Sequence, residues 1–262
     1  MNPYFPADQV ARRSREAIIR GVIWAFIGTL YGLLFVIFYG MAGYALPEVS
    51  PVLVAGTLSA SIAALIYSSM RLASIVAPVA SLVSIFTIII HGQTIHLPSL
   101  VVVNALVGLM TGTVFGMLAK HSRVYRAHAK VVAGVIAGIT VSIVFVLVHE
   151  VFAAFPLVLS IALMCLLTGA TYVILAPRCV RLFDRFKPQV VNGAVVGCGT
   201  SVFVGLVLFV MVTGVAPEVS GSLDDVTRQI RELMPSAFLG GLLGGGIAGF
   251  ASGWLIREWQ DL

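Results

Sequence analysis

Three histidines and a glutamate are the side chains best suited to acid–base or metal chemistry, and their positions predict one cluster. His91 and Glu150 follow two apolar segments, His149 lies beside Glu150, and His96 is in the loop after His91. Both segments start on the same side of a membrane and rise about 1.5 Å per residue, so all four side chains reach its outer boundary. Imidazole titrates near neutral pH, which makes a site for a cation, a proton or a haem-like group one hypothesis. The alternative is that these residues only end helices at the interface, and we therefore assign no metal and no cofactor.

A second set of polar residues lies inside the apolar segments and carries no charge. Asparagine can bridge two helices, while threonine commonly bonds back to its own helix. If a pathway crosses the protein, these side chains are expected to line it, and they suit a small neutral or weakly polar solute. The pathway candidates are Asn104, Thr111, Thr168, Asn192 and Thr200.

The residues needed for most catalytic chemistry are missing. No Asp, Glu, Lys or Arg lies at the middle of an apolar segment, which disfavours a carboxylate proton relay, because charged groups there are costly and mark function. The sequence has no G-x-S-x-G, H-E-x-x-H or phosphate-binding loop, and no dinucleotide motif in a strand–helix context. Its three cysteines, Cys165, Cys179 and Cys198, show neither disulfide nor metal-site spacing. We expect that the protein is not an enzyme.

Composition and hydropathy predict an all-α, polytopic membrane protein. Of the 262 residues, 59% are hydrophobic and only 10% are charged, whereas a soluble domain carries about 25% charged residues. The apolar runs are about 19–25 residues long, the length with which a helix crosses about 30 Å of hydrocarbon. We predict eight membrane spans, at residues 18–42, 51–70, 72–90, 99–119, 131–153, 157–176, 190–213 and 236–256.

The basic residues predict the orientation. Eight spans place both termini on one side, where 14 of the 16 Lys and Arg residues fall, and only Arg228 and Arg231 lie on the other side. The positive-inside rule makes the basic side cytoplasmic, so we expect a bacterial-type inner membrane protein with both ends in the cytoplasm. Trp24, Trp254 and Trp259 are expected to anchor this face. Because the charges sit beside span ends, we expect them to meet lipid headgroups rather than nucleic acid.

A single transmembrane domain is predicted over residues 17–257, between a cytoplasmic N-terminal arm (1–16) and a short cytoplasmic tail (258–262). Residues 217–234 contain Ser222-x-x-Asp225, which is similar to a capping box, and apolar residues at helical spacing follow it. We expect a short amphipathic helix on the outer surface there. LMTGTVFGMLA at 109–119 is similar to LLTGATYVILA at 166–176. This similarity favours repeated helical hairpins in parallel orientation, unless a small apolar alphabet produces it by chance.

Glycines recur every fourth residue within several spans. Residues four apart share one helix face, and glycine there lets two backbones touch, which matters in lipid because hydrophobicity does not drive helices together. The final span carries a second stripe, Gly240, Gly244, Ala248 and Ser252, and is therefore predicted to contact two neighbours. These neighbours lie in this chain, in a second copy or in another subunit. The packing or interface glycines are Gly108, Gly112, Gly116, Gly193, Gly197, Gly241, Gly245, Gly249 and Gly253.

Two functions fit these observations. The first is a channel or transporter for a small solute, which the multi-span architecture and the scattered Thr and Asn residues favour. The second is a non-catalytic structural subunit or assembly factor of a larger membrane complex, which the small-residue faces and the lack of buried charge favour. The expected partners are the lipid bilayer and either further copies of the chain or other membrane subunits, with no nucleic acid.

Overall fold

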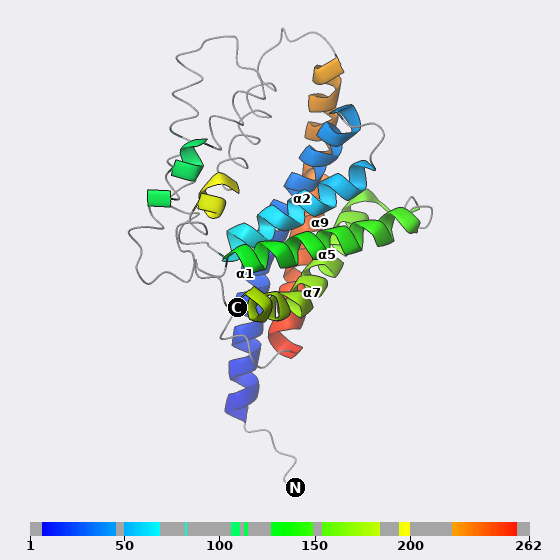
Figure 1. The fold of residues 1–262 in the computed structure, drawn as a ribbon. Helices are drawn as coiled ribbons and strands as arrows, with labels where there is room; N and C mark the ends of the chain where they lie inside the picture. Colours follow the sequence, from blue (N-terminus) through cyan, green and yellow to red (C-terminus); the bar gives the residue numbers. More distant parts are fainter. Residues whose placement is uncertain are drawn as a thin grey trace.

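The computed structural model describes five long helices that pack into one bundle (Figure 1). They are α1 (Ala7–Ala45), α2 (Pro51–Ser68), α5 (Ala127–Leu147), α7 (Leu157–Phe183) and α9 (Ser222–Leu255). The described residues are 7–45, 50–68, 82, 106–110, 113–114, 127–148, 154–183, 194–199 and 222–255, and every regular element within them is helical.

These five helices are long and apolar enough to cross a membrane, which indicates an integral membrane protein. They coincide with the predicted spans at 18–42, 51–70, 131–153, 157–176 and 236–256. The other three predicted spans, at 72–90, 99–119 and 190–213, lie outside the described residues except for short helical pieces. The proposed repeat between 109–119 and 166–176 depends on the same region and stays a prediction.

Helices α1 and α9, from opposite ends of the sequence, form the closest pair in the bundle. A Cβ atom added to Gly245 would lie 2.8 Å from the Cα of Gly28, and one added to Gly253 would lie 2.9 Å from the Cα of Ala17. Residue numbers fall along α1 as they rise along α9 at these contacts, so the two helices are antiparallel. The stripe at 241, 245, 249 and 253 therefore brings α9 into backbone contact with α1, where no side chain has room.

The second stripe of α9 packs on α7. A Cβ added to Gly240 would lie 2.6 Å from the carbonyl oxygen of Val158, and one added to Gly244 would lie 3.0 Å from the Cα of Ala162. Residue numbers rise together on both helices, so α7 and α9 run parallel. Both neighbours of the last span are thus helices of this chain.

Helices α2 and α5 form a second antiparallel pair, which lies together on one side of α1 and α9 (Figure 1). A Cβ added to Gly138 would lie 2.8 Å from the Cα of Thr57, and one added to Gly134 would lie 2.8 Å from the carbonyl oxygen of Ala60. Gly56 leaves room for the hydroxyl of Ser142 on the facing helix.

The segment predicted as a separate surface helix is instead the beginning of α9. Helix α9 runs from Ser222 to Leu255 without interruption and contains Pro235. The apolar residues of this segment pack on α1, since Ile230 is 3% exposed and approaches the backbone of Gly40. The apolar stripe of this segment is therefore buried against a neighbouring helix rather than against a membrane surface.

The predicted N-terminal arm is helical from Ala7 onward and continues directly into the first span. Arg12 and Glu16 form an exposed ion pair one turn apart, with 3.3 Å between Nε and Oε1. Helix α7 likewise passes the predicted end of its span and continues through Pro177 to Phe183. Both extensions carry basic residues beyond the apolar length that a bilayer requires.

Adjacent glycines on α9 provide a sharp test of the backbone contact. The substitution Gly245→Ala should lower the thermal midpoint in detergent by ~3–10 °C, because the new methyl group overlaps α1 and overpacking costs about 1–3 kcal/mol. Gly246→Ala is the matched control, because its Cβ would lie 3.6 Å from the Cβ of Ala25, an ordinary contact. Equal midpoints for the two variants would contradict the contact.

Candidate functional site: a core cavity lined by aromatic and hydroxyl groups

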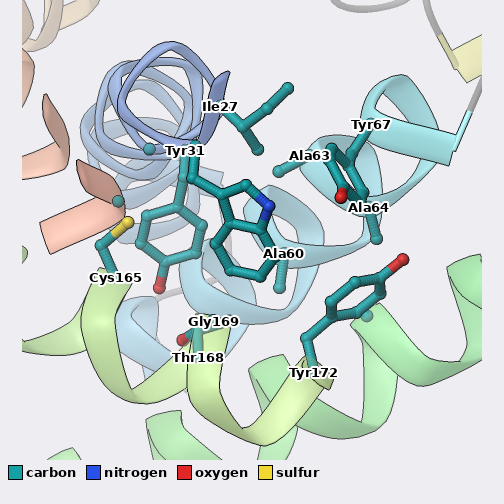
Figure 2. Close-up of a pocket in the computed structure, with 14 residues that line it drawn as sticks. Ile27, Tyr31, Ala60, Ala63, Ala64, Tyr67, Cys165, Thr168, Gly169 and Tyr172 are labelled. Carbon is teal, nitrogen blue, oxygen red and sulfur yellow. The ribbon is translucent and has the colours of Figure 1, made fainter. Parts of the chain in front are cut away.

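All five described helices contribute to a cavity in the core of the bundle (Figure 2). It leaves about 50 Å³ for the centres of water-sized molecules. A single water needs about 10–15 Å³ by this measure, so the cavity has room for about three to five waters or one compact solute. The lining residues that carry the argument are Trp24, Tyr31, Tyr67, Cys165, Thr168 and Tyr172.

Three aromatic rings from three helices pack together along one side of this core cavity. The ring centroids of Trp24 and Tyr67 are 5.5 Å apart, and Tyr172 lies 6.3 Å from each of them. These are the tilted and edge-on contacts that aromatic rings favour. Trp24 is only 6% exposed, so the expectation that it anchors the membrane interface is wrong. Its indole points into the bundle, where the glycine on a facing helix leaves space for the ring.

Gly169 is the residue that admits the indole. A Cβ at this position would lie 2.8 Å from Cζ3 of Trp24 and 3.1 Å from the Cβ of Ala248. Gly28, one turn after Trp24, holds α9 against α1 at the same level. The glycines therefore fix both the spacing of the helices and the depth of the aromatic cluster.

Three hydroxyl groups at the core cavity have no hydrogen-bond partner among the described residues. They belong to Tyr31, Thr168 and Tyr172, which are each at least 94% buried. The hydroxyls of Tyr31 and Thr168 point toward each other (Figure 2) but lack the geometry of a hydrogen bond. An unsatisfied buried hydroxyl costs about 1–3 kcal/mol, so three in one place indicate a polar site that water or a small ligand completes.

Helical spacing explains how these side chains converge. Cys165, Thr168 and Tyr172 follow one another at intervals of three and four residues and so share one face of α7. Trp24 and Tyr31 are seven residues apart and share one face of α1. Both faces turn toward the same point because α9 packs against α1 and α7 at once.

A larger hollow lies about one helical turn from the core cavity, toward the end of α1 and the beginning of α2. This vestibule has a volume of about 790 Å³ and includes Tyr39, Ser50, Ser160 and Gln229 in its lining. Phe35, Ile161 and Met164 also line the vestibule, and they lie one turn from Tyr31, Cys165 and Thr168 of the core cavity. These three apolar side chains are 7%, 1% and 3% exposed.

Of the five predicted pathway residues, Thr168 lines the core cavity. The other four, Asn104, Thr111, Asn192 and Thr200, lie outside the described residues, as does the predicted polar cluster of His91, His96, His149 and Glu150. Gly108 and Gly197 are buried in short helical pieces, whereas Gly112, Gly116 and Gly193 are not described. The aromatic residues were not among the predicted site residues, although the seven-residue spacing of Trp24 and Tyr31 places both on one face of α1.

The described lining of the core cavity is uncharged. Among its described lining residues none carries a charge, and in the described part of the chain no three His, Cys, Asp or Glu side chains gather. A desolvated cation over an aromatic face gains about 2 kcal/mol or more from the ring. Burying an unpaired ion costs several kcal/mol, so the lining favours an uncharged guest.

Comparison of the chain with models of known protein families gives no match, and curated proteins and solved structures give none either.

Removal of the cavity hydroxyls should not destabilise the protein. Thr168→Val and Tyr31→Phe are expected to leave the thermal midpoint in detergent unchanged or to raise it, because each deletes a buried group that lacks a protein partner. Thr140→Val corrects for the helix preference of valine, since the Thr140 hydroxyl is exposed and donates to the carbonyl of Ile136 in its own helix. A loss of more than ~3 °C relative to this control would show that the hydroxyls hold the bundle together.

Proposed function

We propose that the protein is a multi-pass inner-membrane channel or transporter for a small solute. The observation that carries the proposal is the core cavity, which lies inside a bundle of apolar helices and offers three unpartnered hydroxyls. Cavities in membrane bundles that present uncharged polar groups are typical of solute pathways. Thr168, predicted as a pathway residue, is one of these groups.

The directions of the helices support the eight-span topology. Helices α1 and α5 run one way, and α2, α7 and α9 run the other way, as their contacts require. In the predicted eight-span topology successive spans alternate in direction, so the first and fifth spans run one way and the second, sixth and eighth run the other way. The described helices have these same directions.

The distribution of charge on the described helices supports the proposed orientation. Arg12, Arg15 and Arg181 lie at one end of the bundle, where α1 begins and α7 ends, while Arg228 and Arg231 lie near the beginning of α9 at the other end. Under the positive-inside rule the first end is cytoplasmic. The vestibule, which lies toward the end of α1 and the beginning of α2, is then nearer to the outer side than the core cavity is.

The alternative function, a structural subunit of a larger complex, depended on small-residue faces being free for partners. On the described helices these faces are used within the chain, since the stripes of α9 contact α1 and α7 and those of α2 and α5 contact each other. Intramolecular packing therefore accounts for the small-residue faces, which were one of the two observations that favoured the alternative.

The native thiol of Cys165 allows a direct test, because it lines the core cavity. In a Cys179→Ser, Cys198→Ser protein reconstituted in liposomes, a small water-soluble methanethiosulfonate should modify Cys165 and block the osmotic solute flux measured by light scattering. A membrane-spanning solute path must be hydrated at least transiently, which exposes the thiol to the reagent.

The control is a cysteine at Thr140, on the exposed side of α5, in a protein that also carries Cys165→Ser. A lipid-facing thiol there should stay unmodified by the charged reagent and leave the flux unchanged. Absence of any flux, together with a constant set of co-purifying membrane proteins in native mass spectrometry, would instead support the structural subunit.

A further inference from the structure

We propose that the core cavity binds a compact, uncharged solute that both donates and accepts hydrogen bonds, of about the size of urea. This inference rests on the proposed transport function and names the substrate class of the same site. It follows from three properties of the cavity, which are its charge, its size and the arrangement of its polar groups.

The charge of the surroundings argues against ions. The described residues that line the cavity include no carboxylate and no basic group. Arg20 on α1 and the buried Lys130 on α5 each lie one helical turn before a lining residue, and positive charge near the cavity disfavours a cation. An anion would be buried among mostly aromatic and aliphatic groups, with no cation of the described lining in contact with it. The desolvation cost of an unpaired ion makes such binding unfavourable.

The size of the cavity sets an upper limit on the solute. The 50 Å³ available to the centres of water-sized molecules accommodates about three to five non-hydrogen atoms. Formamide and urea fall within this range, whereas glycerol exceeds it and requires the rings to move apart. Trp24, Tyr67 and Tyr172 already contact one another at centroid distances of 5.5–6.3 Å, so the space between them does not admit a larger group.

The polar groups suit a planar amide. Hydroxyls donate and accept, and those of Tyr31 and Thr168 converge at one end of the cavity (Figure 2). The hydroxyl of Tyr172 is directed away from this pair (Figure 2), so the hydroxyls of Tyr31 and Thr168 form the polar end that a compact solute engages. The aromatic rings in the lining suit a planar, uncharged molecule better than a hydrated ion.

The test is a permeability series in proteoliposomes of the full-length protein. Formamide and urea fluxes are measured by light scattering, with glycerol as the larger solute and with methylammonium, potassium and chloride as ions. Formamide and urea should cross at least about tenfold faster than in protein-free vesicles, glycerol more slowly, and the ions at the background rate. Thr168→Val and Tyr31→Phe should each reduce urea flux about threefold to tenfold, the effect of one lost hydrogen bond.

Matched controls separate the cavity hydroxyls from general damage. Thr140→Val and Tyr44→Phe remove hydroxyls from exposed positions and should change urea flux by less than about twofold. A direct binding readout uses Cys165, because urea at millimolar concentration should slow its modification by methanethiosulfonate, while methylammonium chloride should not.

The outcomes distinguish this inference from the function on which it rests. Ion flux comparable with urea flux, or urea flux that is unchanged in both cavity variants, would overturn the substrate class and leave transport in place. If no solute in the series crosses and urea does not protect Cys165, transport itself is wrong and the inference falls with it.

Discussion

The direct backbone contact between α1 and α9 is the constraint on which the rest of the structure depends. In lipid the hydrophobic effect does not drive helices together, so their association relies on close van der Waals contact. Gly28, Gly241 and Gly245 supply it by removing every side chain from the line of contact. Because the second stripe of α9 simultaneously holds α7, the relative position of three helices is set by one helix with two glycine faces.

The core cavity is a consequence of this arrangement. When α1 and α7 are drawn in toward α9, their aromatic and hydroxyl faces meet in the middle of the bundle, and Gly169 leaves the depth that Trp24 needs. The hydroxyls of Tyr31, Thr168 and Tyr172 arrive there without partners among the described residues. Stability and site are thus linked, because the small residues that permit tight packing also determine where large residues must go.

The sequence predicts which segments are helices better than it predicts what those helices contact. Hydropathy and length locate five spans that the structure describes as helices. This works because a bilayer requires about 20 consecutive apolar residues, and such runs are rare outside membrane spans. The glycine spacing indicates two neighbours for α9 but cannot identify them as α1 and α7. Trp24 illustrates the limit, since a tryptophan near a span end is typical of an interface anchor. Only the glycines of other helices, distant in sequence, show that it turns inward, and the first part of α9 similarly packs on α1 rather than on the membrane surface.

The pairing of the first described helix with the last also orders events in time. During synthesis α1 leaves the ribosome long before Ser222 is made, and chains are extended at about 5–20 residues per second. For that interval the glycine face of α1 has no α9 to cover it and must rest against lipid or an insertion factor. The five-helix bundle therefore closes only when α9 arrives, so a chain interrupted before Ser222 lacks the helix that holds α1 and α7 together.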